Sequence, residues 1–403
     1  MDIENIEKRK IKSVQREIIC KIENWGAEGV TIAHDNENKA ILIRYAIPGE
    51  LCRINIYKEA KDYALGEPVE ILEKSEFRIT PQCEYFSMCG GCDLQMINYK
   101  KQIDVKMNVI KESFRRIGGI DFEFTGLITS PNESYYRNTV TFKVNPKKNL
   151  IGFFRKDTKS IIDISECKIA SGEINTALNK IRNSNISLPH NFKVRSTADG
   201  DTVVNMVKTD LYEDREVYET INACGRSLKF KISKDSFFQI NNSVIPLWIE
   251  KIVSFLDDTK SERIFDLYCG IGLITLFVSF FAKETIGVEI AKSSVNDGNH
   301  NIKVNNITTN IKIIQSAVED TIDELGYADV MIVDPPRKGL DEITRGVLLK
   351  MKPKKIIYSS CKASTMARDI KELSSLYSIQ ELIPVDMFPQ THHMEMLSLL
   401  VLK

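Results

Sequence analysis

The chain has 403 residues, equal numbers of acidic and basic residues, and a formal net charge of zero. This length exceeds the usual size of one domain, so two or three cores are expected, and any contact with nucleic acid must come from local basic patches. The odd number of cysteines, nine, argues against a disulfide framework. The amino-terminal sequence MDIENIEKRK has no apolar stretch of the kind an export signal needs, and glycines interrupt the apolar runs, which argues against a membrane span. Together these features predict a cytoplasmic protein.

Residues 10–73 contain short β-type runs separated by turns, among them GVTIAH, KAILIRYAIPGE and GEPVEILE. This spacing predicts a small β-barrel. The pieces WGAEGVTIA and YAIPGELCRINI resemble the turns of a TRAM domain, an OB-like RNA-binding module, and the resemblance implies an RNA contact here. Barrels of this kind serve many purposes, so a plain structural cap is the alternative.

Three cysteines follow in PQCEYFSMCGGCDLQ, with the spacing C-x5-C-x2-C. The two residues between Cys89 and Cys92 are glycines, which let the backbone bend tightly. The thiolates of Cys83, Cys89 and Cys92 can then face one metal. Cys167 is the candidate for a fourth ligand. The set suits either zinc or a [4Fe-4S] cluster, and its spacing does not choose between them. A radical-SAM site is a further alternative, although its usual spacing is C-x3-C-x2-C.

The rest of residues 74–234 is predicted to be a β-rich central domain that carries this metal site. A helix over residues 98–118 is a candidate to pack on the C-terminal domain. The stretch from residue 139 to residue 160 holds six basic residues and one acidic residue, which indicates either an RNA-binding patch or a solvated hairpin.

Residues 235–403 alternate apolar strand-like runs with helical periods, which predicts a doubly wound α/β sheet of the Rossmann type. SERIFDLYCGIGLITLF indicates a strand, a glycine turn and a helix, and ETIGVEI then ends a second strand on Glu289. Folds of this kind place such an acid on ribose hydroxyls. Because Thr275 replaces the last glycine of a dinucleotide-binding turn, S-adenosylmethionine is preferred to NAD as the cofactor.

Asp334 ends an apolar strand in ADVMIVDPPRKGL, and the two prolines stiffen the turn beyond it. Such a D-P-P turn is characteristic of enzymes that methylate bases, including N6-adenine enzymes that need no cysteine. The next strand, KKIIYSSC, ends with Cys361 at the start of a helix, whose dipole, with Lys362, is predicted to lower the pKa of the thiol. A thiolate can add to C6 of uracil and thereby activate C5 for methylation.

A base must then remove the proton from C5. The segment MFPQTHHMEMLSLLVLK offers His392, His393 and Glu395 just before a final apolar strand. Each of these side chains can accept a proton near neutral pH, so chemistry alone does not rank them.

The motifs DSFFQIN, DLYCGIGLITL, GVEI, DPPRKGL, YSSCKAST and FPQTHHMEML occur together and in this order after the cysteine cluster. With them the chain resembles the RNA uracil-5-methyltransferase family, most of all its bacterial 23S rRNA enzymes, over nearly its whole length. The resemblance implies methylation of C5 of a uridine in 23S rRNA to 5-methyluridine, with Cys361 as the nucleophile and Glu395 as the base.

The same resemblance implies two bound groups. S-adenosylmethionine would lie against four residues, which are Gln239, Tyr268, Glu289 and Asp334. A [4Fe-4S] cluster would be held by Cys83, Cys89, Cys92 and Cys167, a feature that tRNA-modifying relatives as a rule lack, together with the TRAM segment. Met394 stands where the family more usually has valine, and the target uridine is left open.

Other functions are weighed against this one. Within the family the alternative is a tRNA uracil-5-methyltransferase. An RNA cytosine-5 methyltransferase would typically place its cysteine in a T-C-S context and a second cysteine after P-P, where this chain has Arg337 and Lys338. An amino-methylating enzyme would not need Cys361, and a non-catalytic RNA-binding protein would not need these motifs together. We expect a monomer that binds RNA and has no membrane partner.

Overall fold

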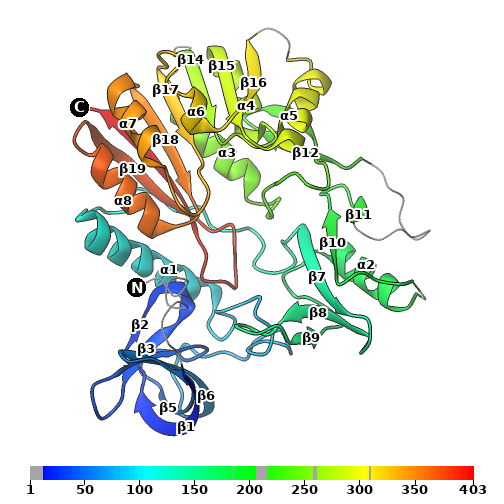
Figure 1. Cartoon of the computed structure of the whole chain (residues 1–403), viewed down its shortest axis with the longest axis vertical. Coiled ribbons are helices and arrows are strands. Elements are labelled where there is room, and N and C mark those ends of the chain that lie inside the picture. Colours follow the sequence, from blue (N-terminus) through cyan, green and yellow to red (C-terminus); the bar gives the residue numbers. More distant parts are fainter. Residues whose placement is uncertain (1–11, 185, 206–215, 257–260, 308–309) are drawn as a thin grey trace. The chain divides into compact units, whose positions relative to one another are not determined.

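The structure, a computed structural model, describes residues 12–184, 186–205, 216–256, 261–307 and 310–403. Figure 1 shows the order of the elements along the chain. They form two compact units, each assembled from separate stretches of sequence. The first unit comprises Met1–Val109, Lys147–Lys168 and Phe388–His393, and the second comprises Ile110–Pro146, Ile169–Met387 and Met394–Lys403. The division into residues 10–73, 74–234 and 235–403 stays a prediction, and residues 10 and 11 lie outside the described part.

The amino-terminal part of the first unit is a six-stranded sheet in the order β1-β5-β6-β4-β3-β2. Neighbouring strands are antiparallel except for β4 and β6, which run parallel. Along β5 buried and half-buried side chains alternate, so one face of the sheet supplies a core that includes Cys52, Ile54 and Ile56. The strands are β1 (Lys12–Lys21), β2 (Asn24–Trp25), β3 (Thr31–His34), β4 (Ala40–Ile43), β5 (Leu51–Glu59) and β6 (Tyr63–Glu73). The predicted strands are present, and their identity as a TRAM barrel stays a prediction.

The first unit also contains a short β-hairpin. Its strands β8 (Leu150–Phe154) and β9 (Ile161–Asp163) pair antiparallel. Helix α1 (Tyr99–Ser113) begins in the first unit and ends in the second. There its continuation, the π-helical turn η3 (Phe114–Gly118), packs against helix α8 (Ala363–Leu373).

The second unit is organised around a seven-stranded sheet in the order β16-β15-β14-β17-β18-β20-β19. The first five strands of this order are parallel, and β20 is antiparallel to both of its neighbours. The strands are β14 (Ser261–Leu267), β15 (Ala282–Glu289), β16 (Ile311–Gln315), β17 (Val330–Val333), β18 (Lys355–Ser360), β19 (Tyr377–Val385) and β20 (Glu395–Leu402). The order reverses between β14 and β17, and in open α/β sheets ligands bind at the carboxyl ends of the strands beside such a switch point.

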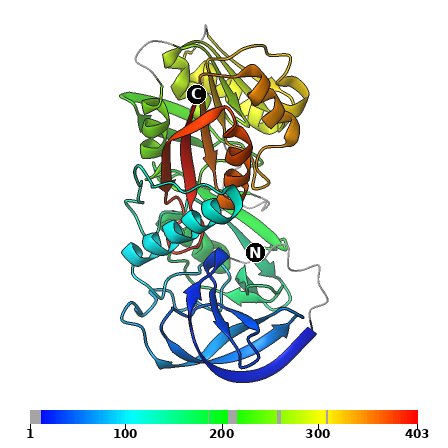
Figure 2. The same cartoon turned by 90° about the vertical axis from the view of Figure 1, so that its left-hand side faces the viewer.

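Helices cover both faces of this sheet, as Figure 2 shows. They are α3 (Ile245–Ser254), α4 (Leu273–Val278), α5 (Lys292–Val304), α6 (Val318–Thr321), α7 (Glu342–Met351) and α8. The predicted doubly wound α/β fold is therefore confirmed for the C-terminal part. Of the helices in the described residues, none combines the length and the apolar character that crossing a membrane requires.

The remainder of the second unit is a smaller α/β region. Strands β7 (Thr139–Asn145), β10 (Asn191–Ser196) and β11 (Thr202–Asn205) pair antiparallel, and α2 (Gly172–Arg182) packs on β10. A separate hairpin of β12 (Tyr218–Ala223) and β13 (Arg226–Lys231) follows. The side chains of Asn301 on α5 and of Asn305 just past its end bond the backbone of β13, which ties this hairpin to the helix.

Candidate active site at the carboxyl edge of the sheet

Five of the predicted site residues gather at one edge of the seven-stranded sheet. Tyr268 follows β14, Glu289 ends β15, Asp334 follows β17 and Cys361 follows β18. Glu395 begins β20, which enters the sheet from the same edge because it runs antiparallel to β18. Parallel strands end at the same edge, so the motifs at these strand ends are brought together by the topology alone.

Strand register places Cys361 and Glu395 opposite each other. Ser360 of β18 pairs with Met396 of β20, and one further step of this antiparallel register sets Cys361 against Glu395. Glu395 also acts electrostatically on the Cys361 thiol, so the two side chains are neighbours at this edge. The Ser359 hydroxyl donates a hydrogen bond of 3.0 Å to Oε1 of the buried Glu395. A thiol and a carboxyl are thus paired across two strands.

The pKa of the Cys361 thiol is raised to about 11, mainly by burial and further by the charges of Glu395 and Asp334. The Arg337 side chain acts in the opposite direction. The sequence-based prediction of a lowered thiol pKa is therefore wrong for the protein without ligands, because burial and two neighbouring acids outweigh the start of α8.

The two acids themselves hold their protons more tightly than usual. Burial raises the pKa of Glu395 well above its ordinary range, and the neighbouring Asp334 adds to this, whereas Ser359 lowers it. Burial also raises the pKa of Asp334 to about 6, again against a hydrogen bond from Ser359. Ser359 was missed by sequence reasoning, although it lies two residues before the predicted nucleophile and must share its face of the strand.

The glycine turn after β14 leaves space for a ligand. Tyr268, Gly270 and Gly272 all have positive φ angles, of 65°, 56° and 83°. Within the described part of the chain, a Cβ at Gly270 would meet nothing within 4 Å beyond its chain neighbours, whereas one at Gly272 would come within 2.8 Å of Leu276. The turn therefore bends sharply against its own helix and stays open on the other side.

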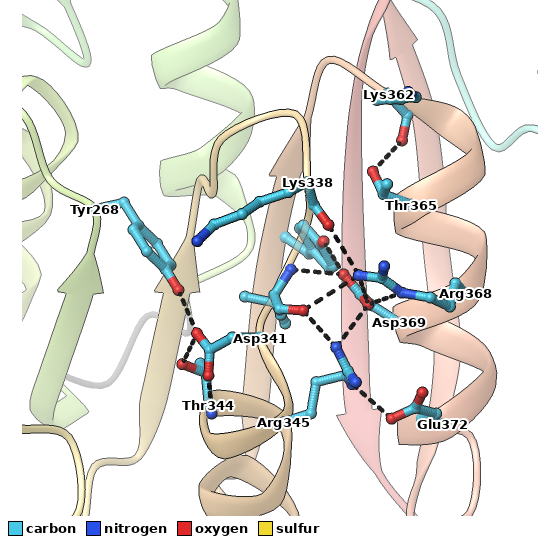
Figure 3. A network of polar contacts seen from close by, with 12 residues as sticks. Tyr268, Lys338, Asp341, Thr344, Arg345, Lys362, Thr365, Arg368, Asp369 and Glu372 are labelled. Atoms are coloured by element: carbon cyan, nitrogen blue, oxygen red, sulfur yellow. Dashed lines mark hydrogen bonds and ion pairs between the residues drawn. The ribbon is translucent and has the colours of Figure 1, made fainter. Parts of the chain in front are cut away.

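Glu289 is held beside this turn by backbone amides. Its Oε2 accepts a hydrogen bond of 3.0 Å from the amide of Gly270, and its Oε1 accepts one of 2.7 Å from the amide of Ala291. The hydroxyl of Tyr268 donates to Asp341 at 3.3 Å, a contact drawn in Figure 3. Gln239 lies in the loop between β13 and α3, where its backbone carbonyl accepts a hydrogen bond from Asn138.

Besides Glu289, Asp334 and Glu395, a fourth acidic side chain, Asp266, lies at this edge. It was not predicted as a site residue from the sequence. It is 1% exposed, one of its oxygens accepts a hydrogen bond of 2.5 Å from Thr275, and the other finds no hydrogen-bond partner among the residues that the structure describes. Burial raises its pKa to about 7, and the charges of Asp334 and Glu289 contribute. Four acids around one edge favour a ligand that carries positive charge, as the sulfonium and ammonium groups of S-adenosylmethionine do.

The buried Asp266 makes a testable contribution to stability. Its folded pKa of about 7 lies above the unfolded value, so stability falls as pH rises between the two and stays low above 7. Relative to an Asp266→Asn variant, the wild-type chain should lose about 2–3 kcal/mol of unfolding free energy between pH 5 and pH 8. Urea unfolding without cofactor measures this. The exposed Asp323→Asn variant should show no such trend, and a pH-independent difference for Asp266→Asn would mean that Asp266 is ionised throughout.

The two histidines next to Glu395 have other partners. Nδ1 of His392 lies 2.7 Å from Asp93, whose carboxylate also accepts from the His392 amide at 3.2 Å. The His393 ring packs against His392 and edge-on to Phe388. Glu395, in contrast, lies at the strand end beside Cys361 and accepts a hydrogen bond from Ser359. The geometry therefore favours Glu395 among the three candidates for the base.

All four predicted metal-binding cysteines lie in the first unit. Burial raises the pKa of Cys92, and the neighbouring Cys167 and Cys89 add to this; Cys89 in turn is influenced by Cys167 and Cys83. The fold therefore brings Cys167 near the other three from far along the chain. Among the described residues, however, no three cysteine, histidine or acidic side chains are arranged so that they could hold a metal ion.

The loop of Cys83, Cys89 and Cys92 is fixed against the β8–β9 hairpin. The amide of Gly90 donates a hydrogen bond of 3.0 Å to Phe154, and a Cβ at Gly90 would come within 3.1 Å of the Lys156 backbone. Lys156 itself forms an ion pair with Asp93, and Arg155 lies 3.7 Å from Glu67. Two of the six basic residues predicted as an RNA patch are thus paired with acids, which weakens that interpretation.

The sheet order, the antiparallel β20 and the acid-lined glycine turn define a Rossmann-like methyltransferase. Residues 202–403 match the family described as tRNA (Uracil-5-)-methyltransferase. An RNA methyltransferase of Clostridium tetani, named as uncharacterized, is 32% identical over 94% of this chain and 95% of its own length. One of Aquifex aeolicus, named likewise, is 32% identical over 91% and 94%. The chain belongs to the RNA uracil-5-methyltransferase family and is an S-adenosylmethionine-dependent RNA methyltransferase.

Among the solved structures with a similar fold, one aligns over most of the chain. It is the Pyrococcus abyssi tRNA (uracil-54, C5)-methyltransferase in complex with S-adenosyl-L-homocysteine, which aligns with a TM-score of 0.73 and 23% sequence identity. The alignment covers 95% of this chain and 100% of that one. At this identity the likeness bears on the fold alone.

Proposed function

We propose that the protein methylates C5 of a uridine in RNA through a covalent bond between Cys361 and C6 of the base. The observation that carries this proposal is the strand register that sets Cys361 opposite Glu395, with Asp334 beside both. A thiol alone would suit many reactions. A thiol paired with a buried carboxyl across two strands suits an addition that must be followed by removal of a proton.

The reaction balances with these groups. Cys361 loses its proton to solvent, its thiolate adds to C6, and the electrons of the C5–C6 double bond move toward C5 and the neighbouring carbonyl. Bound S-adenosylmethionine would supply the methyl group to C5, its methyl–sulfur bond would break, and S-adenosylhomocysteine would leave. Glu395 accepts the proton of C5, the double bond forms again, and the Cys361 thiolate leaves. The base must be extruded from any RNA stack for the thiolate to reach it.

The cofactor is proposed to lie over the open side of the glycine turn. Tyr268 and Glu289 border that turn, Asp334 ends the neighbouring strand, and Gln239 comes from the loop before α3. Glu289 is oriented by two backbone amides and keeps lone pairs for ribose hydroxyls. These residues fit a cationic, ribose-containing cofactor.

The proposed substrate is 23S rRNA. The resemblance that includes the four cysteines and the TRAM-like segment of residues 10–73 supports rRNA, with tRNA as the alternative. The deciding experiment incubates the protein and labelled cofactor with unmodified 23S rRNA and, separately, with unmodified tRNA, and maps the methylated nucleotide. Methyl transfer to a uridine of 23S rRNA alone supports the proposal; transfer to tRNA alone overturns the substrate, and transfer to cytidine or adenine overturns the reaction. We further propose a cytoplasmic monomer.

Cys83, Cys89, Cys92 and Cys167 are proposed to hold a [4Fe-4S] cluster with a structural or RNA-related role. Four soft sulfur donors, three from one loop and Cys167 from far along the chain, influence one another and are the donor set that such a cluster requires. Protein purified without oxygen should absorb visible light near 400 nm, contain about four irons per chain, and lose both in a Cys167→Ala variant. The Cys224→Ala variant should keep both. Colourless protein with stoichiometric zinc would contradict the cluster.

A further inference from the structure

The loop that follows Asp334 is anchored to the helix that follows Cys361. Its tip, Pro336–Lys338, is exposed, whereas Gly339 and Leu340 are buried. In Figure 3 the side chain of Asp369 lies at the centre of a polar network between α8 and this loop. Asp369 is fully buried and lies on α8, the helix that begins just after Cys361.

Asp369 bonds both the loop and β18, the strand that leads to Cys361. Its Oδ2 accepts hydrogen bonds of 2.8 Å from the Leu340 amide and 2.7 Å from the hydroxyl of Tyr358 on β18. Its Oδ1 accepts from Arg368 at 2.7 Å and from Arg345 at 3.3 Å. One carboxylate thus holds the loop, the strand that leads to Cys361 and two guanidinium groups.

Arg368 makes the second set of contacts to the loop. Its Nη2 donates to the carbonyl of Lys338 at 3.0 Å and to that of Leu340 at 3.2 Å. Gly339, between these two residues, has a φ of 76°, and a Cβ there would come within 2.6 Å of the Asp369 carboxylate and 2.7 Å of Arg368. Only a glycine lets the loop lie this close to α8.

The loop carries Arg337, whose positive charge favours the thiolate form of Cys361. Glu395 and Asp334 oppose it. Strands β17 and β18 are parallel neighbours, so the loop leaves the sheet beside the end of β18. The position of Arg337 therefore depends on the hydrogen bonds that hold the loop at Lys338 and Leu340.

We propose that Asp369 and Arg368 are positioning residues, which hold the loop of residues 335–340 so that Arg337 keeps its place near the end of β18, where its charge acts on Cys361. This inference rests on the proposed role of Cys361 as the nucleophile. It assigns no contact with RNA or cofactor to Asp369 or Arg368 themselves.

The test measures how fast iodoacetamide alkylates Cys361 at fixed pH between 8 and 9.5, with peptide mass spectrometry to separate the cysteines. Arg337→Gln, Arg368→Leu and Gly339→Ala should each slow alkylation about threefold or more, because half a pKa unit changes the thiolate fraction by that factor. Gly339→Ala alters no charge, so its effect reports position alone. Glu372→Gln, which breaks only the outer ion pair of Arg345, should leave the rate unchanged.

Two outcomes would overturn the inference. If Arg337→Gln slows alkylation but Arg368→Leu and Gly339→Ala do not, the network does not position the loop. If Arg337→Gln has no effect, Arg337 does not act on the thiol. The proposed function is tested separately, because wild-type protein alkylated at Cys361 must lose methyl transfer if the thiol is the nucleophile. Thermal unfolding confirms that each variant is folded.

Discussion

A Cys361→Ala variant is expected to lose methyl transfer to RNA by more than about 1,000-fold, which corresponds to about 4 kcal/mol of activation free energy. C5 of uracil is a poor nucleophile, and without addition of a thiolate at C6 it gains no negative charge with which to attack a methyl group. The variant should still bind S-adenosylmethionine, because Cys361 lies at the end of β18 and the glycine turn lies after β14. Transfer of a labelled methyl group and calorimetry of cofactor binding measure the two properties.

The Cys224→Ala variant is the matched control for this experiment. Cys224 is likewise partly buried and lies in the second unit, but in the turn between β12 and β13. It should methylate at the wild-type rate. A Cys361→Ala enzyme that methylated as fast as wild type would exclude covalent catalysis, and would favour direct attack of the kind used by amino-methylating enzymes.

The sequence predicted those site residues that lie in a motif at the end of a strand. Glu289, Asp334 and Cys361 each follow an apolar run, and parallel strands must end at one edge, so their proximity follows from pattern alone. The choice among His392, His393 and Glu395 was not predictable in this way. It depends on the antiparallel pairing of β20 with β18 and on Asp93, which lies about 300 residues before the histidine that it binds.

Electrostatic features were the hardest to predict from sequence. The start of a helix after Cys361 suggested a lowered thiol pKa, but burial and the two acids across the sheet raise it. Asp369 looks like an ordinary polar residue of an amphipathic helix, and only the structure shows that it binds a loop and a neighbouring strand. Such effects arise from contacts between distant segments, which local periodicity does not report.

Glu395→Gln is expected to trap a covalent protein–RNA adduct that survives denaturation, while turnover falls by more than about 100-fold. Glutamine keeps the shape of the side chain, and its oxygen can still accept the hydrogen bond that Ser359 now donates at 3.0 Å. Addition of Cys361 and methyl transfer can then proceed, whereas removal of the C5 proton cannot. A denaturing gel with labelled RNA measures the adduct.

The dependence of this adduct on pH separates the role of Glu395 from that of the histidine. Burial and Asp334 raise the pKa of Glu395, so its carboxylate form, which the base step needs, becomes more populated as pH rises. In the wild-type enzyme the adduct should therefore be longer-lived at low pH and shorter-lived at high pH, and in Glu395→Gln its lifetime should no longer respond to pH. His392→Ala should release RNA normally, because the His392 ring is engaged by Asp93. Accumulation of adduct in His392→Ala, with normal release in Glu395→Gln, would transfer the role of the base to the histidine.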